Sequence, residues 1–445
     1  MNRLSLAVAA SLAVSALHCA PVSADDLLQI YQEAERNDPA LAAARANFEA
    51  TKEAVPQARS ALLPNVNVAG AVNANNYDAS IHSDPHVDVR RDFWFGALTV
   101  SVAQPLYRYA NTVALSEAKK QVEQSDYTLA AAQQDLMLRV AVAYFDILLA
   151  QFNVELAESQ KAAVSEQLAQ AKRNFEVGVA TITDTNEAQA AYDSIVAQEI
   201  AARNDLENRR TALRAIIGRN PPELKRLGTT FEPSLPTPDS LDYWVQQALT
   251  DNIGVKIAQY NSDIATLEVD RQRAGHLPTL DLVGSYNVQG SNGTVQIGVD
   301  SNSRQGTIGL ALNVPIYQGG FVDSRVRQAI AQQDSARQSL ELARRNALSN
   351  AQIGFTGVTS AVASIKAFQQ ALVSAQTAYE SNKTGQEVGV RTNLDVLNTQ
   401  QSLFQRRRDL AQAYFNYLIG VLRLKSAVGT LSIDDIQAIN RRLQG

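Results

Sequence analysis

Few side chains in this 445-residue sequence could do chemistry. The best metal-like spacing is that of His82, Asp84 and His86, which occupy alternate positions in one polar segment. Pro85 interrupts the run and no fourth ligand stands beside it, which favours a solvated surface loop over a metal site. We find no Ser/His/Asp set, glycine-rich phosphate loop or cysteine cluster in the sequence. The sequence therefore predicts neither an enzyme nor a bound cofactor.

The N-terminus predicts export from the cytoplasm. Arg3 precedes an uncharged stretch, Leu4–Leu17, and Val22–Ala24 supply the small residues of a cleavage site. A membrane anchor is the alternative, but 14 residues are too few to span a bilayer. Cleavage ahead of a lipid-modified Cys19 is a second alternative, which the residues before Cys19 fit poorly. Residues 1–24 are therefore predicted to be a signal peptide.

The composition of the exported chain narrows its class further. Without Cys19 the chain has no cysteine, so packing or oligomerisation must replace disulfides. The net charge is −5 and both signs are interspersed, which argues against a nucleic-acid partner. No later stretch reaches 18 apolar residues, and the best candidate, Val140–Ala150, contains Asp146. A membrane crossing would therefore not use a transmembrane helix.

The chain reads as an internal duplication. Four landmarks recur in one order at offsets of 210 to 214 positions. They are Gln32–Ala34 with Gln246–Ala248, Ala61–Val66 with Gly275–Leu280, Pro105–Tyr107 with Pro315–Tyr317, and Glu176–Val179 with Glu387–Val390. We predict a first repeat over residues 25–217 and a second over 241–445.

Residues 218–240 join the two predicted repeats. This segment contains five of the thirteen prolines, a density that neither a helix nor a sheet ladder tolerates. A flexible linker between independent domains is the alternative. The matched halves on either side favour a crossover within one architecture.

Both repeats predict the same order of elements. A helix comes first, over Asp26–Leu62 and Leu241–His276, and a Leu-Pro pair ends it. Two segments with period-2 alternation follow in each repeat, which predicts four strands in total. Their apolar positions are Val66, Val68, Val72, Ala74, Trp94, Leu98, Val100 and Val102 in the first repeat, and Leu280, Leu282, Tyr286, Val288, Ile308, Leu310, Leu312 and Val314 in the second.

Long helices are predicted after each strand pair. Residues 106–220 and 316–445 contain no proline and are rich in alanine, glutamine and leucine. Apolar residues step by 4 and 3 from Leu136 to Ala157, the period of a coiled-coil seam. A continuous helix over Asn111–Val177 would reach about 100 Å. Such a rod is unusual in a globular domain.

Four amphipathic strands cannot close into a barrel by themselves. Bacterial membrane barrels need at least about eight strands, and open sheet edges are not tolerated in lipid. Two chains would give 8 strands, three would give 12 and four would give 16. The polar set, which includes Asn65, Asn67, Thr99, Ser101 and Asn287, suits a wet lumen. A soluble β-sandwich is the alternative.

Several strings of residues resemble the TolC outer-membrane efflux family, and the resemblance covers essentially the whole exported chain. The strings are Leu27–Ala34, Ala61–Pro64, Ala143–Leu148, Arg173–Gly178, Gly275–Leu282, Pro315–Gly320 and Lys425–Leu431. The resemblance implies an α+β membrane protein that forms a homotrimer in the outer membrane. Its 12-stranded β-barrel, with four strands per chain, would continue into a long α-helical periplasmic barrel. It also implies docking, through a periplasmic adaptor, to an inner-membrane RND or ABC pump.

The resemblance further implies a gate at the periplasmic tip, where inner helices coil shut and open like an iris. Two aspartates three positions apart line the narrowest point in the family. The matching positions here are Asp395 and Asn398, so one of the two carboxylates is missing. A ring of carboxylates on a threefold axis repels itself and attracts cations, so fewer carboxylates imply weaker cation binding.

The same resemblance implies a latch that holds the gate closed. The family's tethering arginine matches Arg391, and its partners match Thr183 and Asp184. A tethering tyrosine of the family is replaced by Gln386, which places part of the latch in doubt. An ordinary exposed ion pair, worth about 0–1 kcal/mol, is the alternative for Arg391 and Asp184.

The rival function is that of a periplasmic coiled-coil adaptor or scaffold, which would also be long, helical and duplicated. The paired amphipathic strands favour an export duct. In that case Asn76–Asp92 and Gly290–Gln305 are expected to be extracellular loops. Drugs and secreted proteins remain equally possible as cargo.

Overall fold

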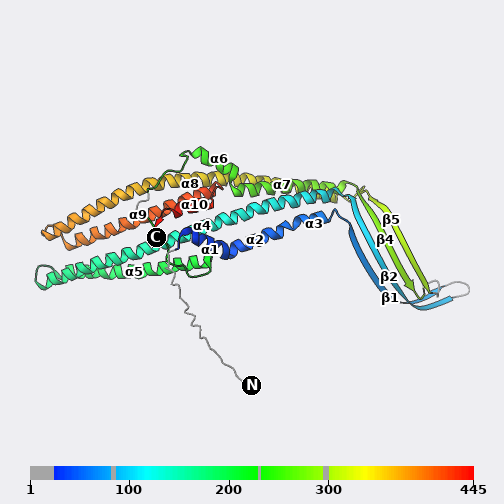
Figure 1. Ribbon diagram of the computed structural model, residues 1–445, viewed down its shortest axis with the longest axis horizontal. Helices are drawn as coiled ribbons and strands as arrows, with labels where there is room; N and C mark the ends of the chain where they lie inside the picture. The colour runs from blue at the N-terminus through cyan, green and yellow to red at the C-terminus, as the bar shows by residue number, and fades with distance from the viewer. Residues whose placement is uncertain (1–24, 82–86, 229–231, 294–299, 445) are drawn as a thin grey trace, which may run out of the picture.

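The computed structural model describes residues 25–81, 87–228, 232–293 and 300–444. Ten α-helices and six strands lie in these ranges, and the molecule is strongly elongated (Figure 1). The long helices form one end and a four-stranded sheet the other. The predicted signal peptide, residues 1–24, and the metal-like set of His82, Asp84 and His86 lie outside the described residues.

The predicted first helix of each half is broken into shorter pieces. The pieces are α1 (Leu27–Asn37), α2 (Pro39–Lys52) and α3 (Ala54–Ser60), and α6 (Leu241–Asp251), α7 (Ile253–Arg273) and the 3-10 turn η1 (Ala274–His276). The prediction of one continuous helix was wrong, and at two of the breaks a capping side chain starts the next helix. Asp38 caps α2, whose first residue is Pro39, and Asn252 caps α7.

Four long strands form one antiparallel sheet. β1 (Asn65–Ile81) pairs with β2 (Val87–Tyr107), which pairs with β4 (Thr279–Ser291), and β4 pairs with β5 (Ser301–Asn313). The strands reach beyond the predicted ends, so the loop boundaries Asn76–Asp92 and Gly290–Gln305 were too wide. Cross-strand ion pairs support part of the extension, such as Asp78–Arg90 at 2.6 Å. The outer strands β1 and β5 each have one partner within the chain.

One face of this sheet is apolar. The register places Val68, Val100, Tyr286 and Gly306 in one row, and Gly70, Leu98, Val288 and Arg304 in the next. Val72, Ile308 and Leu310 are 81%, 81% and 67% exposed on this face. From Val66 to Ala74 the apolar stripe runs about 26 Å along the strand, close to the roughly 25 Å apolar band of a membrane barrel. The predicted alternation is therefore confirmed, and no core covers it within the chain.

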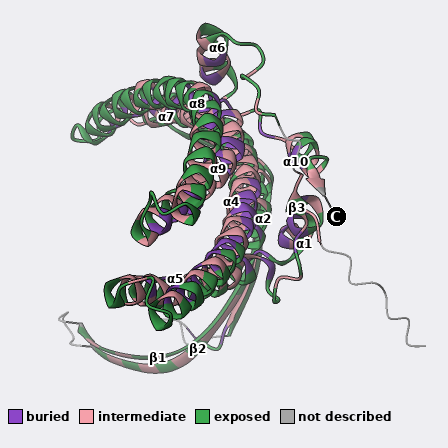
Figure 2. Ribbon diagram, turned by 90° about the vertical axis from the view of Figure 1, so that its left-hand side faces the viewer, coloured by how far each residue is buried: buried purple, intermediate pink, exposed green. Residues whose placement is uncertain are grey.

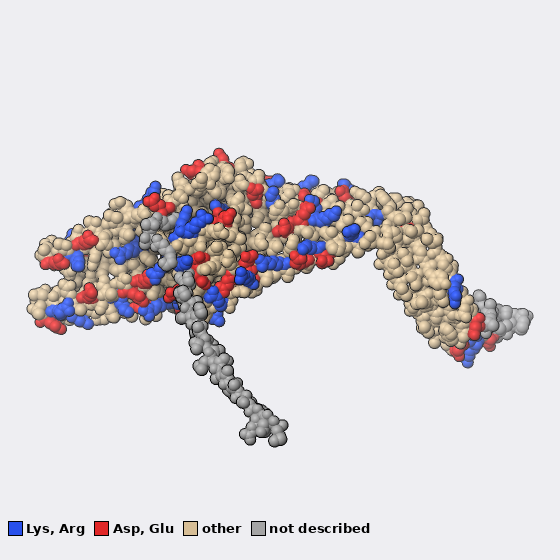
Figure 3. Space-filling view, in the orientation of Figure 1, with Lys and Arg blue, Asp and Glu red and all other residues tan. Residues whose placement is uncertain are grey.

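The opposite face is polar. Thr99 donates a hydrogen bond to Asn287 Oδ1 at 3.1 Å, and the hydroxyls of Ser285 and Thr307 lie 2.7 Å apart. Charged residues in the strands lie at the two ends, so the middle of the sheet carries no charge (Figure 3). The sheet thus has one face suited to lipid and one suited to water.

Two helical hairpins continue from the sheet. α4 (Tyr109–Glu176) turns into α5 (Ile182–Ile217), and α8 (Phe321–Glu387) turns into α9 (Asn393–Ala427). The 68 residues of α4 correspond to about 100 Å, as predicted. Five members of the predicted seam are buried, including Leu136, Val140 and Ile147, which confirms that this stripe of α4 faces the core. The helices form one curved layer, seen from the hairpin ends in Figure 2.

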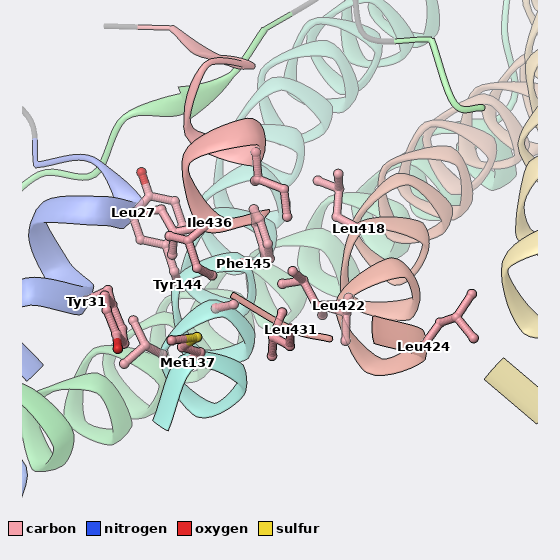
Figure 4. Packing of buried hydrophobic residues seen from close by; sticks show 14 of the residues in the cluster. Leu27, Tyr31, Met137, Tyr144, Phe145, Leu418, Leu422, Leu424, Leu431 and Ile436 are labelled. Carbon is pink, nitrogen blue, oxygen red and sulfur yellow. The ribbon is translucent and has the colours of Figure 1, made fainter. Parts of the chain in front are cut away.

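Small elements lie beside the middle of the long helices. They are α1, α6, α10 (Ile433–Asn440) and the strand pair β3 (Arg226–Leu227) with β6 (Leu443–Gln444). Their apolar side chains join the main core, in which Tyr144 and Phe145 of α4 are fully buried (Figure 4). The Tyr144 hydroxyl donates to Lys225 O at 2.8 Å and holds the proline-rich crossover against α4.

One described helix, α4, is long and apolar enough to cross a membrane. Half of its most apolar window is buried inside the chain, and this part of α4 carries Tyr144 and Phe145 of the main core. Burial in a core explains that composition as well as a membrane would.

The two halves meet along a seam between α4 and α7 that contains a buried carboxyl. Glu117 of α4 is 8% exposed, and its Oε2 lies 3.2 Å from Nε of Arg271 on α7. Arg271 also binds Glu268 at 2.5 Å, so one guanidinium faces two carboxyl groups. Burial, together with a hydrogen bond to Glu268, raises the pKa of Glu117 to about 7 despite the Arg271 charge.

We predict that this seam weakens as the pH rises from acidic to neutral. A carboxyl whose folded pKa is raised favours the folded state at low pH, and this contribution is lost as pH rises from about 4.5 to about 7. The free energy of unfolding of Glu117→Gln, measured by thermal unfolding, should therefore exceed that of the wild type by about 1–3 kcal/mol at pH 8. At pH 5 the variant should not be more stable by this amount. The exposed Glu123→Gln on the same helix is the control. An equal effect of Glu117→Gln at both pH values would contradict the prediction.

Candidate functional site

The two hairpin turns at the helical end share one backbone design. Gly178 ends the first helix of one hairpin with φ 83°, and Gly389 does so in the other with φ 76°. Val179 donates its N–H to Asn174 O at 2.9 Å, and Val390 donates to Gly385 O at 2.8 Å. A left-handed residue closes a helix in this way, and glycine adopts that conformation without a Cβ penalty. The recurring Glu-Val-Gly-Val motif thus specifies both tips.

Each second helix begins with a capping box. Thr181 Oγ1 donates to Asp184 Oδ2 at 2.7 Å, and the Asp184 N–H donates back to Thr181 Oγ1 at 3.2 Å. Thr392 and Asp395 repeat the arrangement at 2.9 and 3.1 Å. The aspartates that the sequence assigned to a gate therefore also start the helices that carry them.

These contacts hold both carboxylates in the charged state. The Thr181 hydroxyl and N–H lower the pKa of Asp184. The Thr392 N–H and hydroxyl lower the pKa of Asp395, with a smaller contribution from the Arg391 charge. Both side chains remain anionic and in a fixed rotamer across the physiological pH range.

The two predicted constriction residues lie on the first two turns of α9. Asp395 is half-buried and Asn398 is exposed, while Val396 and Leu397 between them are buried. Three positions along a helix place Asp395 and Asn398 on neighbouring parts of one surface. The structure therefore brings this pair together within one chain.

The predicted latch residues are not joined within one chain. Arg391 is exposed at the start of α9, and Thr183 and Asp184 lie at the start of α5. Across the parts of the chain that the structure describes, no carboxylate lies within 4 Å of the Arg391 guanidinium. Gln386 donates to Asn393 Oδ1 at 3.2 Å, so it links the two ends of its own turn.

The turns expose an apolar surface that the sequence analysis missed. Val177 and Val179 are 72% and 75% exposed, and Val388 and Val390 are 68% and 77% exposed. The signal was present in the repeated motif, but its valines were treated as markers of the duplication. We name these four residues the valine tips.

Several polar atoms near the tips are buried without a hydrogen-bond partner. They include Thr185 Oγ1 on α5 and Asn393 Nδ2 and Gln400 Oε1 on α9. A buried polar atom left unpaired costs about 1–3 kcal/mol. No cluster of metal-ligating side chains is found in the described residues.

Comparisons with known proteins agree with this architecture. Residues 30–219 and 244–430 match the family described as "Outer membrane efflux protein". The chain is 35% identical to outer membrane protein TolC of Vibrio cholerae over 95% of both chains. It is 31% identical to the alkaline protease secretion protein AprF of Pseudomonas aeruginosa, over 93% of this chain and 86% of that one.

Solved structures share the fold at lower identity. The CmeC outer membrane channel of Campylobacter jejuni gives a TM-score of 0.78 at 16% identity, covering 94% of this chain and 90% of that one. The outer membrane protein VceC of Vibrio cholerae gives 0.76 at 20% identity, covering 91% and 96%.

We predict that Thr392→Ala loosens the start of α9. The substitution removes a hydroxyl that both donates to and accepts from Asp395, which costs about 1 kcal/mol. Amide hydrogen exchange at residues 393–397 should accelerate. Thr399→Ala is the matched control, because its hydroxyl bonds only to carbonyls of its own helix, those of Asp395 and Val396. Unchanged exchange in Thr392→Ala would show that the box does not hold the helix start.

Proposed function

Because the chain belongs to the outer membrane efflux protein family, we propose that three copies assemble into a gated duct that works with a periplasmic adaptor and an inner-membrane RND or ABC pump. The protein is an outer-membrane channel for the export of drugs or proteins, and it extends into the periplasm. The family is one of transport proteins and not of enzymes. The rival role of a periplasmic adaptor or scaffold is therefore set aside.

The open sheet is the observation that carries the assembly. Its four strands have an apolar face and two edge strands, β1 and β5, with one partner each in the chain. Unpaired backbone groups are not tolerated in lipid, so neighbouring chains must supply the missing partners. Three chains give a 12-stranded barrel, and its outward face is the apolar one.

Internal duplication is supported by the strand register. Adding 214 to a residue of β1 and 210 to its partner in β2 gives a pair of β4 and β5. Val68 with Val100, for example, becomes Leu282 with Leu310. The same offsets align the sequence landmarks. Each hairpin of strands and its following helices would then be one copy of an ancestral unit.

The wall of the duct follows from the two-faced sheet and the curved helical layer. The row of Asn67, Ser101, Ser285 and Thr307 places polar side chains on the face opposite the apolar one. A barrel closed with that face inward encloses water. The strand ends near Ile81, Val87, Ser291 and Ser301 are then extracellular.

The hairpin tips are the proposed gate. Asp395 and Asn398 would line the constriction, and Arg391 of one hairpin would latch to Thr183 and Asp184 of a neighbouring one. The carboxylate of Asp184 is charged and held by its cap, which suits an acceptor of fixed geometry. Gln386 contributes by stiffening its own turn rather than by tethering a neighbour. Unpaired polar atoms at the tips favour a structure that can repack.

The valine tips are the proposed docking surface for the periplasmic adaptor. Four largely exposed valines at the ends of two hairpins cover little area in one chain, but three chains would present twelve of them in a ring. The cargo then follows from the pump, because the family is one of transport channels. Relatives named for protease secretion and for efflux both match this chain over most of its length.

The assembly is tested by mass and conductance together. Protein purified in detergent should have the mass of three chains and should form ion-conducting pores in planar bilayers. A stable monomer that conducts as well would overturn the 12-stranded barrel.

We predict that Arg391→Ser opens the gate without harming assembly. Each latch is an exposed pair worth about 0–1 kcal/mol, but three copies act on one concerted opening. Single-channel conductance and antibiotic leak should rise. The exposed Arg345→Ser on α8, which pairs with Glu341 of its own helix, is the control. Wild-type conductance of Arg391→Ser would place the latch elsewhere.

A further inference from the structure

The strand pairing between the two halves of the sheet predicts how strands of neighbouring chains pair. β2 of the first half pairs with β4 of the second, for instance Leu98 with Val288 and Val100 with Tyr286. If the halves are copies, β2 corresponds to β5 and β4 corresponds to β1. The edge strands β5 and β1 of two neighbouring chains should then pair as β2 and β4 do. This step depends on the trimer proposed above.

The register of that seam can be read from the offsets. Adding 210 to the number of a β2 residue and subtracting 214 from that of its β4 partner maps the pair Leu98–Val288 onto Ile308–Ala74. The same shift turns Val100–Tyr286 into Leu310–Val72. Both new pairs unite residues of the apolar face, so the register continues that face from one chain to the next.

The strand lengths fit this register. Ser301, the first residue of β5, falls opposite Ile81, which is the last residue of β1. The part of β1 beyond Asn76 lies further out than the paired part of β4, which ends opposite Phe95. β5 of a neighbouring chain would pair with this outer part of β1. The longer first hairpin thus gains a partner along its second side.

The register brings two opposite charges together. The internal pair of Trp94 and Asn292, which lies one step beyond the ladder, maps onto Arg304 and Asp78. In the internal seam Asn292 Oδ1 accepts from the Trp94 N–H at 2.7 Å, and the Asn292 N–H donates to Trp94 O at 3.3 Å. The strands therefore keep their alignment at this row. We propose that the barrel closes by pairing β5 with β1 of the partner subunit, with Arg304 bound to Asp78 of the partner subunit.

The surroundings of both residues suit such a pair. Arg304 is exposed on the apolar face, in the row of Leu98 and Val288, where an arginine without a counter-charge is unfavourable next to lipid. Within the described ranges no carboxylate of its own chain lies within 4 Å of it. Asp78 already accepts from Arg90 Nε at 3.0 Å and Nη2 at 2.6 Å, and both bonds end on Oδ2. Its other oxygen can accept from a second guanidinium, which gives an Arg–Asp–Arg arrangement at the outer end of the barrel.

Cysteine pairs test the register in the intact protein. The exported chain contains no cysteine of its own if Cys19 leaves with the signal peptide, so introduced thiols are unambiguous. Asp78→Cys with Arg304→Cys, and Val72→Cys with Leu310→Cys, should each give covalently linked trimers in outer membranes treated with a short thiol cross-linker. Tyr77→Cys with Arg304→Cys is the control, because those positions lie on opposite faces.

Slipped registers are tested in the same experiment. Asn76→Cys or Ser80→Cys with Arg304→Cys would report a shift of two residues. Cross-linking of either pair in preference to Asp78→Cys with Arg304→Cys would overturn the proposed seam. Native mass measurement distinguishes a failure of the proposed register from a failure of the proposed trimer. A trimer without the expected cross-links refutes the register alone, whereas a monomer refutes the assembly on which it rests.

A double-mutant cycle tests the charge pair itself. Arg304→Ala and Asp78→Ala should each lower the temperature at which the trimer dissociates in detergent. The double variant should add little to the larger single effect, because the two residues act on one contact. Fully additive shifts would show that Arg304 and Asp78 do not interact. Arg90→Ala measures the contribution of the contact within one chain.

Discussion

An incomplete hydrogen-bonded sheet with one apolar face sets the conditions for the rest of this molecule. β1 and β5 are edge strands, and the apolar residues between them have no core to cover them within the chain. In water such a surface would aggregate, and in lipid its open edges would leave backbone groups unpaired. Only assembly in a membrane satisfies both requirements. The sheet is therefore consistent with the outer-membrane location of the protein, and it carries the proposal that several chains assemble there.

The two halves of the chain use their shared design differently. Between β2 and β4 the seam lies inside one chain, and Arg108 binds Asp281 across it at 2.6 Å. Below it, α4 and α7 are joined by Arg271 between two carboxyl groups. At the proposed outer seam the position that matches Arg271 at the offset of 214 is Gln57, which is uncharged. The arginine that joins α4 and α7 within the chain therefore has no counterpart there.

The hairpin tips combine rigidity with incomplete packing. Glycines with positive φ and threonine–aspartate boxes fix the backbone of each turn. Around these turns, buried polar atoms such as Gln400 Oε1 lack partners, and four valines face solvent. Stiff ends on helices about 100 Å long are suited to movements that pivot elsewhere. The main core around Tyr144 and Phe145, where the small elements surround the helices, provides a fixed point.

The sequence by itself determined the elements and their order. Period-2 alternation predicted both faces of the sheet, Leu-Pro pairs marked where strands begin, and the spacing from Leu136 to Ala157 predicted the coiled coil. These signals are local, because alternation and helical period are written into neighbouring residues. Only the tertiary structure decided that β2 pairs with β4, because those residues are about 190 positions apart and the sequence records no register between them. It also decided that Asp184 and Asp395 cap their own helices, and that Glu117 is buried against α7. The valine tips were visible as a motif, but exposure depends on what packs around a residue, and no spacing along the chain specifies that.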